Sequence, residues 1–305
     1  MVRPRVRLPR VRLAQQLQQR SLHSVPKLDH DFSNGVPGVL SADGFQMAWT
    51  EYMTHTLDKL NALTAGTDLE TRDTKQIIHA TARDPDQAPI FNHASMAHNT
   101  HFFFKTLTPT PKPMPPQLAA DLSTAFSSLE TLRREMTLTA ASMFGPGFVW
   151  LVKASSSAAS TGPSAAGILS SAGGPASASS SSSSSAAAGA SPSGAEYRIL
   201  TTYLAGTPYP GAHWRLQGRD MNTAGAAGSA SGFLRSTQRA NQLGAKPPGS
   251  LDLVPLLCLN TWEHTWLRDY GIGGKRAFAE AWWDAVDWSV VAEAANIRPR
   301  PAFQV

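Results

Sequence analysis

The sequence has little of what several common classes of protein require. It contains one cysteine, Cys258, which excludes an internal disulfide and any zinc or iron–sulfur site built from several cysteines. No apolar run reaches the roughly 18 residues that a membrane-spanning helix needs, so we expect no membrane association. No glycine-rich phosphate loop of the common forms occurs, which leaves a nucleotide-handling enzyme without support. Charged residues are also scarce, at 16% of 305 residues.

The net charge of +5 is distributed unevenly along the chain. Residues 1–28 carry seven basic residues and no acidic residue, so the remainder has a net charge of −2. The cationic, acid-free segment at residues 1–23 is typical of a mitochondrial transit peptide, with cleavage expected near residues 20–24. A secretory signal is disfavoured because arginines interrupt every apolar run, and the remaining alternative is a basic arm that binds nucleic acid. The sequence therefore predicts import into the mitochondrial matrix.

The apolar periodicity predicts helices first and strands later. Spacings of three and four predict helices at residues 41–65, 91–107, 117–143 and 275–285. Short apolar runs predict strands at residues 148–152, 197–203 and 251–260. Because the predicted strands follow a purely helical region, the fold class is α+β.

Two segments are predicted to be disordered insertions. Residues 154–195 include seven consecutive serines and no charged residue, a composition that cannot bury enough apolar surface to fold. Because strand-like residues flank this segment, we interpret it as the expanded loop of a hairpin. A second insertion is expected at residues 221–249. The remaining chain divides into a domain at residues 24–110 and a domain at residues 117–295.

Five separated motifs carry a resemblance to the iron/manganese superoxide dismutases. Leu256-Leu257-Cys258-Leu259-Asn260-Thr261-Trp262-Glu263-His264 resembles the strand of that family that ends in Asp-x-Trp-Glu-His. The other four are Leu60-Asn61, Asn99 followed by Phe102–Phe104, Phe144–Leu151 and Phe278–Trp288. The resemblance implies an N-terminal helical hairpin followed by a mixed domain, in which helices flank a three-stranded antiparallel sheet.

The same resemblance implies that the metal site of the family is degenerate. Its four ligands, three histidines and one aspartate, fall on Ala48, Thr100, Asn260 and His264. Only His264 keeps a ligand side chain, and iron and manganese need several nitrogen and oxygen donors. The resemblance therefore implies no catalytic residue, no metal, no cofactor and no enzyme activity. The resemblance also aligns Arg198 with the outer-sphere residue that lies beside the metal ligands in the family. An arginine there would bring positive charge toward the site.

Histidines elsewhere provide a weaker alternative. His93, His98 and His101 lie on one predicted helix within a sector of about 140°, so a site completed by another element is conceivable. Polar residues at a helix edge are the more common interpretation. In the dismutase family the Glu-His segment lies at the two-fold interface, which makes Glu263 and His264 candidates for a subunit contact.

The combination of a transit segment, lost ligands and low-complexity insertions is similar to the dismutase-like proteins of the fungal mitochondrial small ribosomal subunit. That similarity implies a structural role in mitochondrial translation, with ribosomal proteins and ribosomal RNA as partners. It also implies a heterodimer with a second dismutase-like paralogue, and which of the two this chain represents stays open. The alternatives are an active iron/manganese dismutase and a dismutase-like binding protein outside the ribosome.

Overall fold

The computed structural model describes residues 23–155, 195–213 and 252–297. The predicted transit segment, apart from His23, lies outside the described residues. The insertion predicted at residues 221–249 also lies outside the described residues. Of the insertion predicted at residues 154–195, only the ends are described. Within the described part the first helices precede the three-stranded antiparallel sheet, one short helix lies between its second and third strands in the sequence, and further helices follow the sheet. The predicted α+β fold is confirmed.

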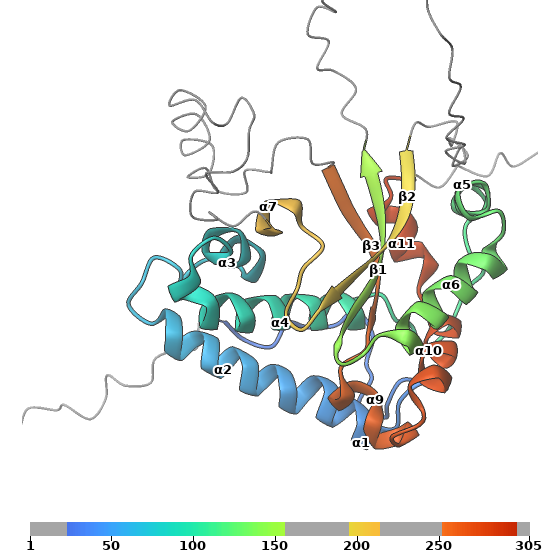
Figure 1. Ribbon diagram of the computed structural model, residues 1–305. Helices are drawn as coiled ribbons and strands as arrows, with labels where there is room; N and C mark the ends of the chain where they lie inside the picture. Colours follow the sequence, from blue (N-terminus) through green and yellow to red (C-terminus); the bar gives the residue numbers. More distant parts are fainter. Residues whose placement is uncertain (1–22, 156–194, 214–251, 298–305) are drawn as a thin grey trace, which may run out of the picture.

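The N-terminal region is a helical hairpin, as predicted. Its first arm runs without interruption through α1 (Ala42–Phe45), the π-helical turn η1 (Gln46–Glu51) and α2 (Tyr52–Thr64). Ser41 caps this arm, because its hydroxyl accepts a hydrogen bond from the Gly44 N–H at 3.0 Å. The second arm is α4 (Ala88–Lys105), which packs along α2 (Figure 1).

Several short helices were not predicted from the sequence. They are α3 (Thr74–Thr81), the 3₁₀ turn η2 (Pro85–Gln87), α7 (Pro210–His213), α9 (Glu263–Tyr270) and α11 (Trp288–Ala294). Helices of this length carry too few turns for a periodic apolar pattern to be recognised, and tertiary packing stabilises them. α3, for example, begins at the Asp73 cap and packs on α4.

The single helix predicted at residues 117–143 is wrong. The structure has two helices there, α5 (Pro116–Phe126) and α6 (Leu129–Ser142). Ser127 between them has a φ of +66°, which a helix interior does not permit. Ser128 then starts α6 as its N-cap, accepting a hydrogen bond from the Thr131 N–H at 3.0 Å. Apolar residues keep their helical spacing across the break, which explains the error.

The sheet contains β1 (Gly147–Ser155), β2 (Ala195–Tyr203) and β3 (Asp252–Asn260) in the order β2-β1-β3. Both neighbouring pairs are antiparallel, so the predicted β1–β2 hairpin is confirmed. Pro255 lies on the edge strand β3, at a register shift opposite Leu151 and Val152. Strand prolines are confined to such edges and bulges because they lack an N–H group.

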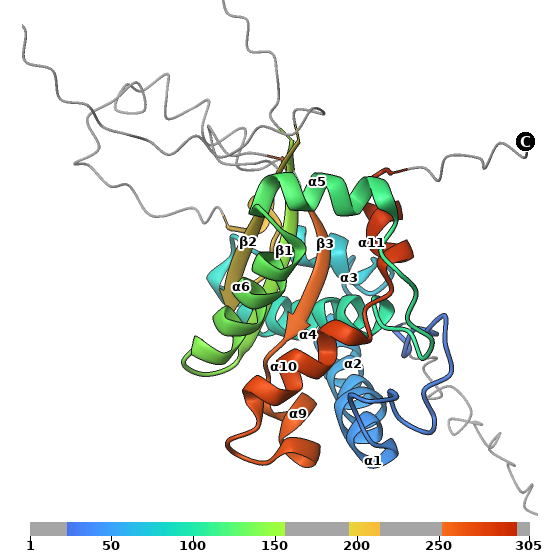
Figure 2. The same ribbon diagram turned by 90° about the vertical axis from the view of Figure 1, so that its right-hand side faces the viewer.

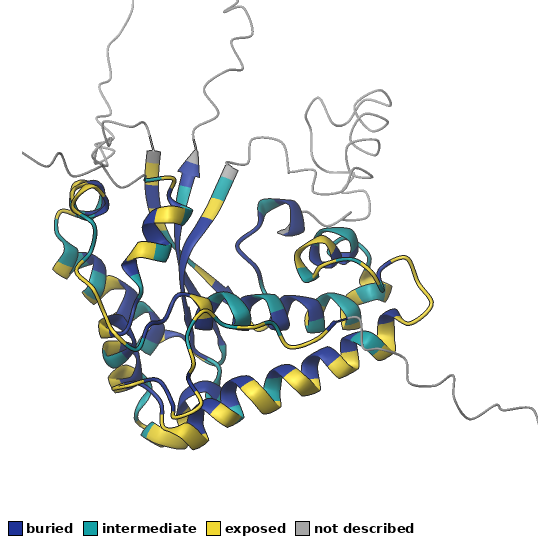
Figure 3. Cartoon of the chain, turned by 180° about the vertical axis from the view of Figure 1, so that it is seen from behind, coloured by how far each residue is buried: buried dark blue, intermediate teal, exposed yellow. Residues whose placement is uncertain are grey.

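Helices enclose the sheet from both sides. Figures 1 and 2 show α3 and α7 on one side of the sheet and α5, α6 and α11 on the other, with α4 beneath it. α9 (Glu263–Tyr270) follows β3 and packs on α1 and η1, while α10 (Lys275–Asp284) packs on α6. In the rear view the side of α2 that faces away from the molecule is exposed and its inner side is buried (Figure 3). The hairpin therefore joins the same apolar core as the sheet.

Candidate functional site

The four residues that the resemblance aligns with the metal ligands lie on four packed elements. Ala48 is on η1, Thr100 on α4, Asn260 ends β3 and His264 is in the first turn of α9. α9 packs on η1, and α4 packs on both α2 and β3. Ala48, Thr100 and Asn260 are fully buried, and His264 is partly buried.

His264 is held by aromatic stacking. The Tyr52 ring lies nearly parallel to the imidazole, with 3.8 Å between the ring centroids and 13° between the planes. Trp262 contacts the same imidazole at a centroid distance of 5.8 Å. Burial lowers the pKa of His264 to about 4, so the ring is neutral near pH 7. Its Nε2 atom is buried and has no hydrogen-bond partner within the described residues.

Tyr52 is a site residue that the sequence interpretation did not single out. Burial raises the pKa of its phenol, and a hydrogen bond with the Thr56 side chain opposes this shift. The sequence could have indicated Tyr52 as a site residue, because it follows Ala48 by four residues and residues at this spacing share one face of a helix.

The polar groups at Asn260 and Thr100 do not suit a metal ion. The Asn260 Oδ1 atom accepts a hydrogen bond from the Trp262 N–H at 2.9 Å. The amide that remains, Nδ2, is a hydrogen-bond donor and cannot bind a cation. Within the described part of the chain, neither this nitrogen nor the Thr100 hydroxyl has a partner.

The donor set therefore does not fit the iron or manganese ion of the dismutases. One imidazole nitrogen and one hydroxyl are offered, without the carboxylate that balances the charge of the cation. No group of three or more histidine, cysteine or acidic side chains that could hold a metal occurs among residues 23–155, 195–213 and 252–297.

The three histidines of α4 have separate surroundings. His93 Nδ1 lies 2.8 Å from the Pro89 carbonyl oxygen of its own helix. His98 Nε2 lies 2.7 Å from the Tyr209 hydroxyl, and burial followed by the nearby Lys75 charge lowers the pKa of His98 to about 4. The His101 ring packs against Trp49 with 6.0 Å between the ring centroids. The structure does not bring them together around one point.

Arg198 does not approach the degenerate site. It is exposed, and its Nη2 atom lies 2.7 Å from the carboxylate of Glu196, two residues earlier on β2. The expectation that Arg198 brings positive charge toward the site is wrong. Residues that differ by two on a strand share one face of the sheet, which here is exposed.

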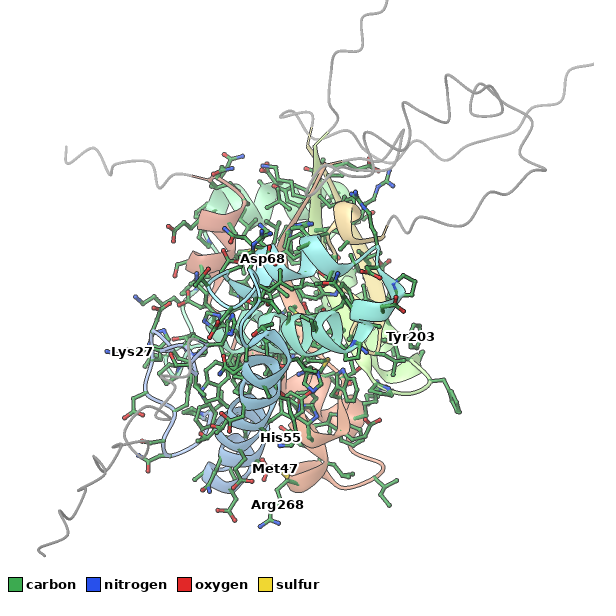
Figure 4. The ribbon with its side chains drawn as sticks, turned by 90° about the vertical axis from the view of Figure 1, so that its left-hand side faces the viewer. Lys27, Met47, His55, Asp68, Tyr203 and Arg268 are labelled. Atoms are coloured by element: carbon green, nitrogen blue, oxygen red, sulfur yellow. The ribbon has the colours of Figure 1, made fainter. Side chains whose placement is uncertain are left out.

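Glu263 is partly exposed, and several apolar side chains of other segments are exposed. The Glu263 carboxylate forms no hydrogen bond or salt bridge within the described residues, although its charge raises the pKa of Lys275 against the effect of burial. Phe144 is 96% exposed and Ile272 is 91% exposed. Tyr203 and Leu204, at the end of β2, are also exposed, and Figure 4 shows Tyr203 at the side of the molecule.

Hydrogen bonds join these exposed segments. The Leu204 N–H donates to the Pro146 carbonyl at 3.0 Å, and the Trp262 indole donates to the Leu204 carbonyl at 3.3 Å. The Lys275 ammonium donates to the Met143 carbonyl at 2.7 Å. The turn that carries Phe144 is thus tied to the end of β2 and to the start of α10. We call Phe144, Tyr203, Leu204 and Ile272 the apolar rim.

The C-terminal part of the chain matches the family "Iron/manganese superoxide dismutases, C-terminal domain" over residues 222–294. The chain is 25% identical to the small ribosomal subunit protein mS43 of Schizosaccharomyces pombe over 280 residues, which cover 89% of this chain and 83% of that protein. It is 26% identical to the small ribosomal subunit protein mS42 of the same organism over 220 residues, which cover 69% and 68% of the two chains.

The regions that align with dismutases themselves are shorter. The chain is 30% identical to the iron superoxide dismutase of Nostoc sp. over 126 residues, 41% of this chain and 63% of that enzyme. It is 33% identical to the chloroplastic iron superoxide dismutase 1 of Arabidopsis thaliana over 113 residues, 37% of this chain and 53% of that enzyme. The resemblance to dismutases and to dismutase-like ribosomal proteins is confirmed, and so is the dismutase-like fold.

Proposed function

We propose that this protein is a structural component of the mitochondrial small ribosomal subunit, where it supports translation without metal and without catalysis. The similarity to a small ribosomal subunit protein extends over 89% of the chain. The acid-free basic segment at residues 1–23 supports a mitochondrial location. We expect its neighbours to be ribosomal proteins and ribosomal RNA.

One observation carries the non-catalytic part of the proposal. The Asn260 amide oxygen is occupied by the Trp262 N–H, so the position that aligns with the metal-binding aspartate presents only N–H groups. A dismutase site needs a redox metal, and such a metal needs an anionic donor and several imidazoles, whereas this site has no carboxylate and a single imidazole, His264. The fold is retained and the chemistry of the site is not.

Sedimentation tests the ribosomal assignment. Mitochondrial lysate is separated on a magnesium-containing gradient, and we expect the protein to migrate with the small subunit. When EDTA removes the magnesium, its migration should change together with that of other small-subunit proteins. Migration at the top of the gradient under both conditions would refute the assignment. Elemental analysis of the purified protein tests the second part, and stoichiometric iron or manganese that survives dialysis would refute it.

We further propose that the protein pairs with a second dismutase-like chain through the surface around Glu263 and the apolar rim. Phe144 and Ile272 are nearly fully exposed, and the Leu204 N–H donates to Pro146 beside the Phe144 turn, which brings exposed apolar side chains of two segments together. Contiguous exposed apolar patches mark contact surfaces. Glu263 offers an unpaired carboxylate beside them. A heterodimer is favoured over a homodimer because a ribosome provides one asymmetric position per subunit.

Substitutions on this surface test the pairing. Phe144→Asp should reduce recovery of the partner from tagged protein, and it should preserve the fold because the side chain is 96% exposed. Glu263→Ala with His264→Ala should weaken pairing by about 2–5 kcal/mol, the usual cost of removing a hydrogen-bonded charged group from an interface. Glu135→Ala with His93→Ala, both away from α9, is the matched control. Unchanged recovery from Phe144→Asp, or recovery of self-associated chains only, would refute the pairing.

A further inference from the structure

The last turn of α9 is fastened to the start of α1 by polar contacts. The Asp269 carboxylate accepts two hydrogen bonds from Ser41, one from the backbone N–H at 2.9 Å and one from the hydroxyl at 2.6 Å. The neighbouring Arg268 guanidinium lies 3.1 Å from the Asp43 carboxylate. Figures 1 and 2 show α9 beside α1. We call the two hydrogen bonds between Asp269 and Ser41 the Asp269 lock.

The surroundings of the Asp269 carboxylate fit it closely. It lies at the N-terminus of the helical arm formed by α1, η1 and α2, where backbone N–H groups favour a negative charge. Gly44 leaves room for it, because a Cβ atom at that position would collide with the carboxylate. The Ser41 hydroxyl that donates to Asp269 also accepts from the Gly44 N–H at 3.0 Å. The N-cap of the arm and the end of α9 therefore form one hydrogen-bonded unit.

The turn that follows the lock carries an exposed apolar side chain. The Gly274 N–H donates to the Gly271 carbonyl at 3.1 Å, which closes a tight turn with Ile272 at its tip. Gly271 has a φ of +68°, which glycine adopts without steric cost. Just before the turn, the Tyr270 hydroxyl donates to the Val39 carbonyl at 2.8 Å. Ile272 is thus 91% exposed on a turn whose beginning is held in place.

Lys275 holds the other end of this turn and connects it to the rest of the apolar rim. Its ammonium donates to the Met143 carbonyl at 2.7 Å, and Met143 directly precedes Phe144 in the chain. Burial lowers the pKa of Lys275, and the charge of Glu263 opposes this shift. The segments that carry Ile272, Phe144 and Glu263 therefore meet at Lys275.

We propose that Asp269 is a positioning residue for the pairing with a second dismutase-like chain, because the Asp269 lock holds Ile272 in place as an apolar anchor for that chain. The inference rests on the proposed pairing. A side chain whose backbone is already fixed loses little freedom on association, which makes the contact stronger. Because an apolar anchor contributes most when it enters a pocket, the partner should present an apolar pocket to Ile272.

A double-mutant cycle tests the inference. Tagged full-length chains with Asp269→Ala, Ile272→Ala or both are isolated from mitochondria, and mass spectrometry measures the amount of the second dismutase-like chain per tagged chain. Each single substitution should lower this ratio by about fivefold, the change expected for an anchor contact. The double variant should fall well short of the product of the two effects, because Asp269 acts through Ile272. Glu280→Ala, which removes an exposed carboxylate that pairs with Arg276 on α10, is the control and should leave the ratio unchanged.

The outcomes separate this inference from the pairing itself. If the unmodified protein recovers no dismutase-like chain, the pairing is refuted and the inference falls with it. If the unmodified protein recovers that chain, an unchanged ratio for Asp269→Ala overturns the inference alone, and so does a double variant that shows the full product of the two single effects.

Hydrogen exchange provides a second measurement that does not depend on the partner. In Asp269→Ala the backbone amides of residues 271–274 should exchange faster than in the unmodified protein, while those of the sheet keep their rates because Asp269 is exposed. Asp269→Asn, which keeps the shape and one acceptor oxygen, replaces the alanine variant if that variant does not fold, and should change both measurements in the same direction. Unchanged exchange in the turn would show that the lock does not hold Ile272 in place.

Discussion

His98 and His264 are buried as neutral imidazoles, and this makes the stability of the protein dependent on pH. Burial lowers both pKa values to about 4, whereas an unfolded histidine titrates near 6.5. Between these values the unfolded chain binds more protons than the folded chain, so the free energy of unfolding decreases as the pH falls. The contribution is fully present above pH 6.5, and about 3 kcal/mol per histidine is lost on reaching pH 4.

Unfolding in urea at several pH values checks this prediction. The variants His98→Gln and His264→Gln should each show a smaller loss of stability between pH 7 and pH 4.5. His55→Gln, at an exposed position of α2, is the control and should keep the slope of the unmodified protein. A slope that is unchanged in both buried-site variants would contradict the assignment.

The buried polar groups of Thr100 and Asn260 that lack a hydrogen-bond partner among the described residues lead to two predictions, in which the free energy of unfolding changes in opposite directions. Thr100→Val keeps the shape of a fully buried side chain and removes a hydroxyl without a partner, so stability should stay equal or rise by up to about 1 kcal/mol. Asn260→Asp places a carboxylate in the same environment and should cost more than about 2 kcal/mol at pH 7.

Denaturant unfolding distinguishes these outcomes. The loss in Asn260→Asp should diminish in acid, because burial raises the pKa of the new carboxyl and the neutral form is tolerated. An Asn260→Asp variant that is as stable as the unmodified protein at pH 7 would indicate a cation at this site and would contradict its degenerate character.

At the scale of single residues, the sequence was informative where a motif fixed the alignment. The motif predicted that Asn260 ends a strand and that His264 follows it closely. In the structure Asn260 ends β3 and His264 lies in the first turn of α9. Tyr52 was missed because the family motif does not contain it, although it makes the main contact with His264. Arg198 was misplaced because no motif anchors it and strand register decides which face a side chain occupies.

At the scale of elements, long amphipathic helices and apolar strands were predictable, and short connecting elements were not. α2, α4 and the three strands carry clear periodic or continuous apolar patterns. α3 and α11 contain eight and seven residues, too few for periodicity to identify them. The break between α5 and α6 depends on the backbone conformation of Ser127, which apolar spacing does not report.

The break between α5 and α6 yields a testable pair of substitutions. Ser127→Gly should raise the free energy of unfolding by about 1 kcal/mol, because glycine adopts the observed φ of +66° without steric cost. Ser128→Ala should lower it by about 1 kcal/mol, because the N-cap hydrogen bond to the Thr131 N–H is lost. Thermal unfolding of the two variants should give shifts of opposite sign, and a loss of stability in Ser127→Gly would contradict the proposed strain.

Because β1 and β2 pair as a hairpin, we predict that the long connection between them is dispensable for folding and assembly. Ser155 and Ala195 are paired opposite each other at the open end of the two strands, so a short Gly/Ser turn can replace residues 156–194. The closure entropy of a loop changes only slowly with its length, and the folded core makes its own contacts. We expect the deletion variant to fold and to co-sediment with the small subunit. Failure to co-sediment at normal expression would assign a role in assembly to these residues.

At the scale of the whole molecule, the chain has a dismutase-like fold, and we propose that this fold serves without metal chemistry. Phe144 and Ile272 are nearly fully exposed, and the buried Asn260 presents an amide whose oxygen accepts from the Trp262 N–H. A protein with these two properties acts by occupying a place in an assembly. Its abundance should therefore follow that of the assembly, because an unpaired copy would expose the apolar rim to solvent.

Quantitative mass spectrometry of purified mitochondrial small subunits tests this central claim most directly. Isotope-labelled peptides from residues 23–155 measure the amount of this protein relative to other small-subunit proteins after a high-salt wash. The account predicts equimolar amounts of this protein, of a second dismutase-like chain and of the other proteins of the subunit. A clearly substoichiometric amount that the salt wash removes would contradict a structural role in the small subunit.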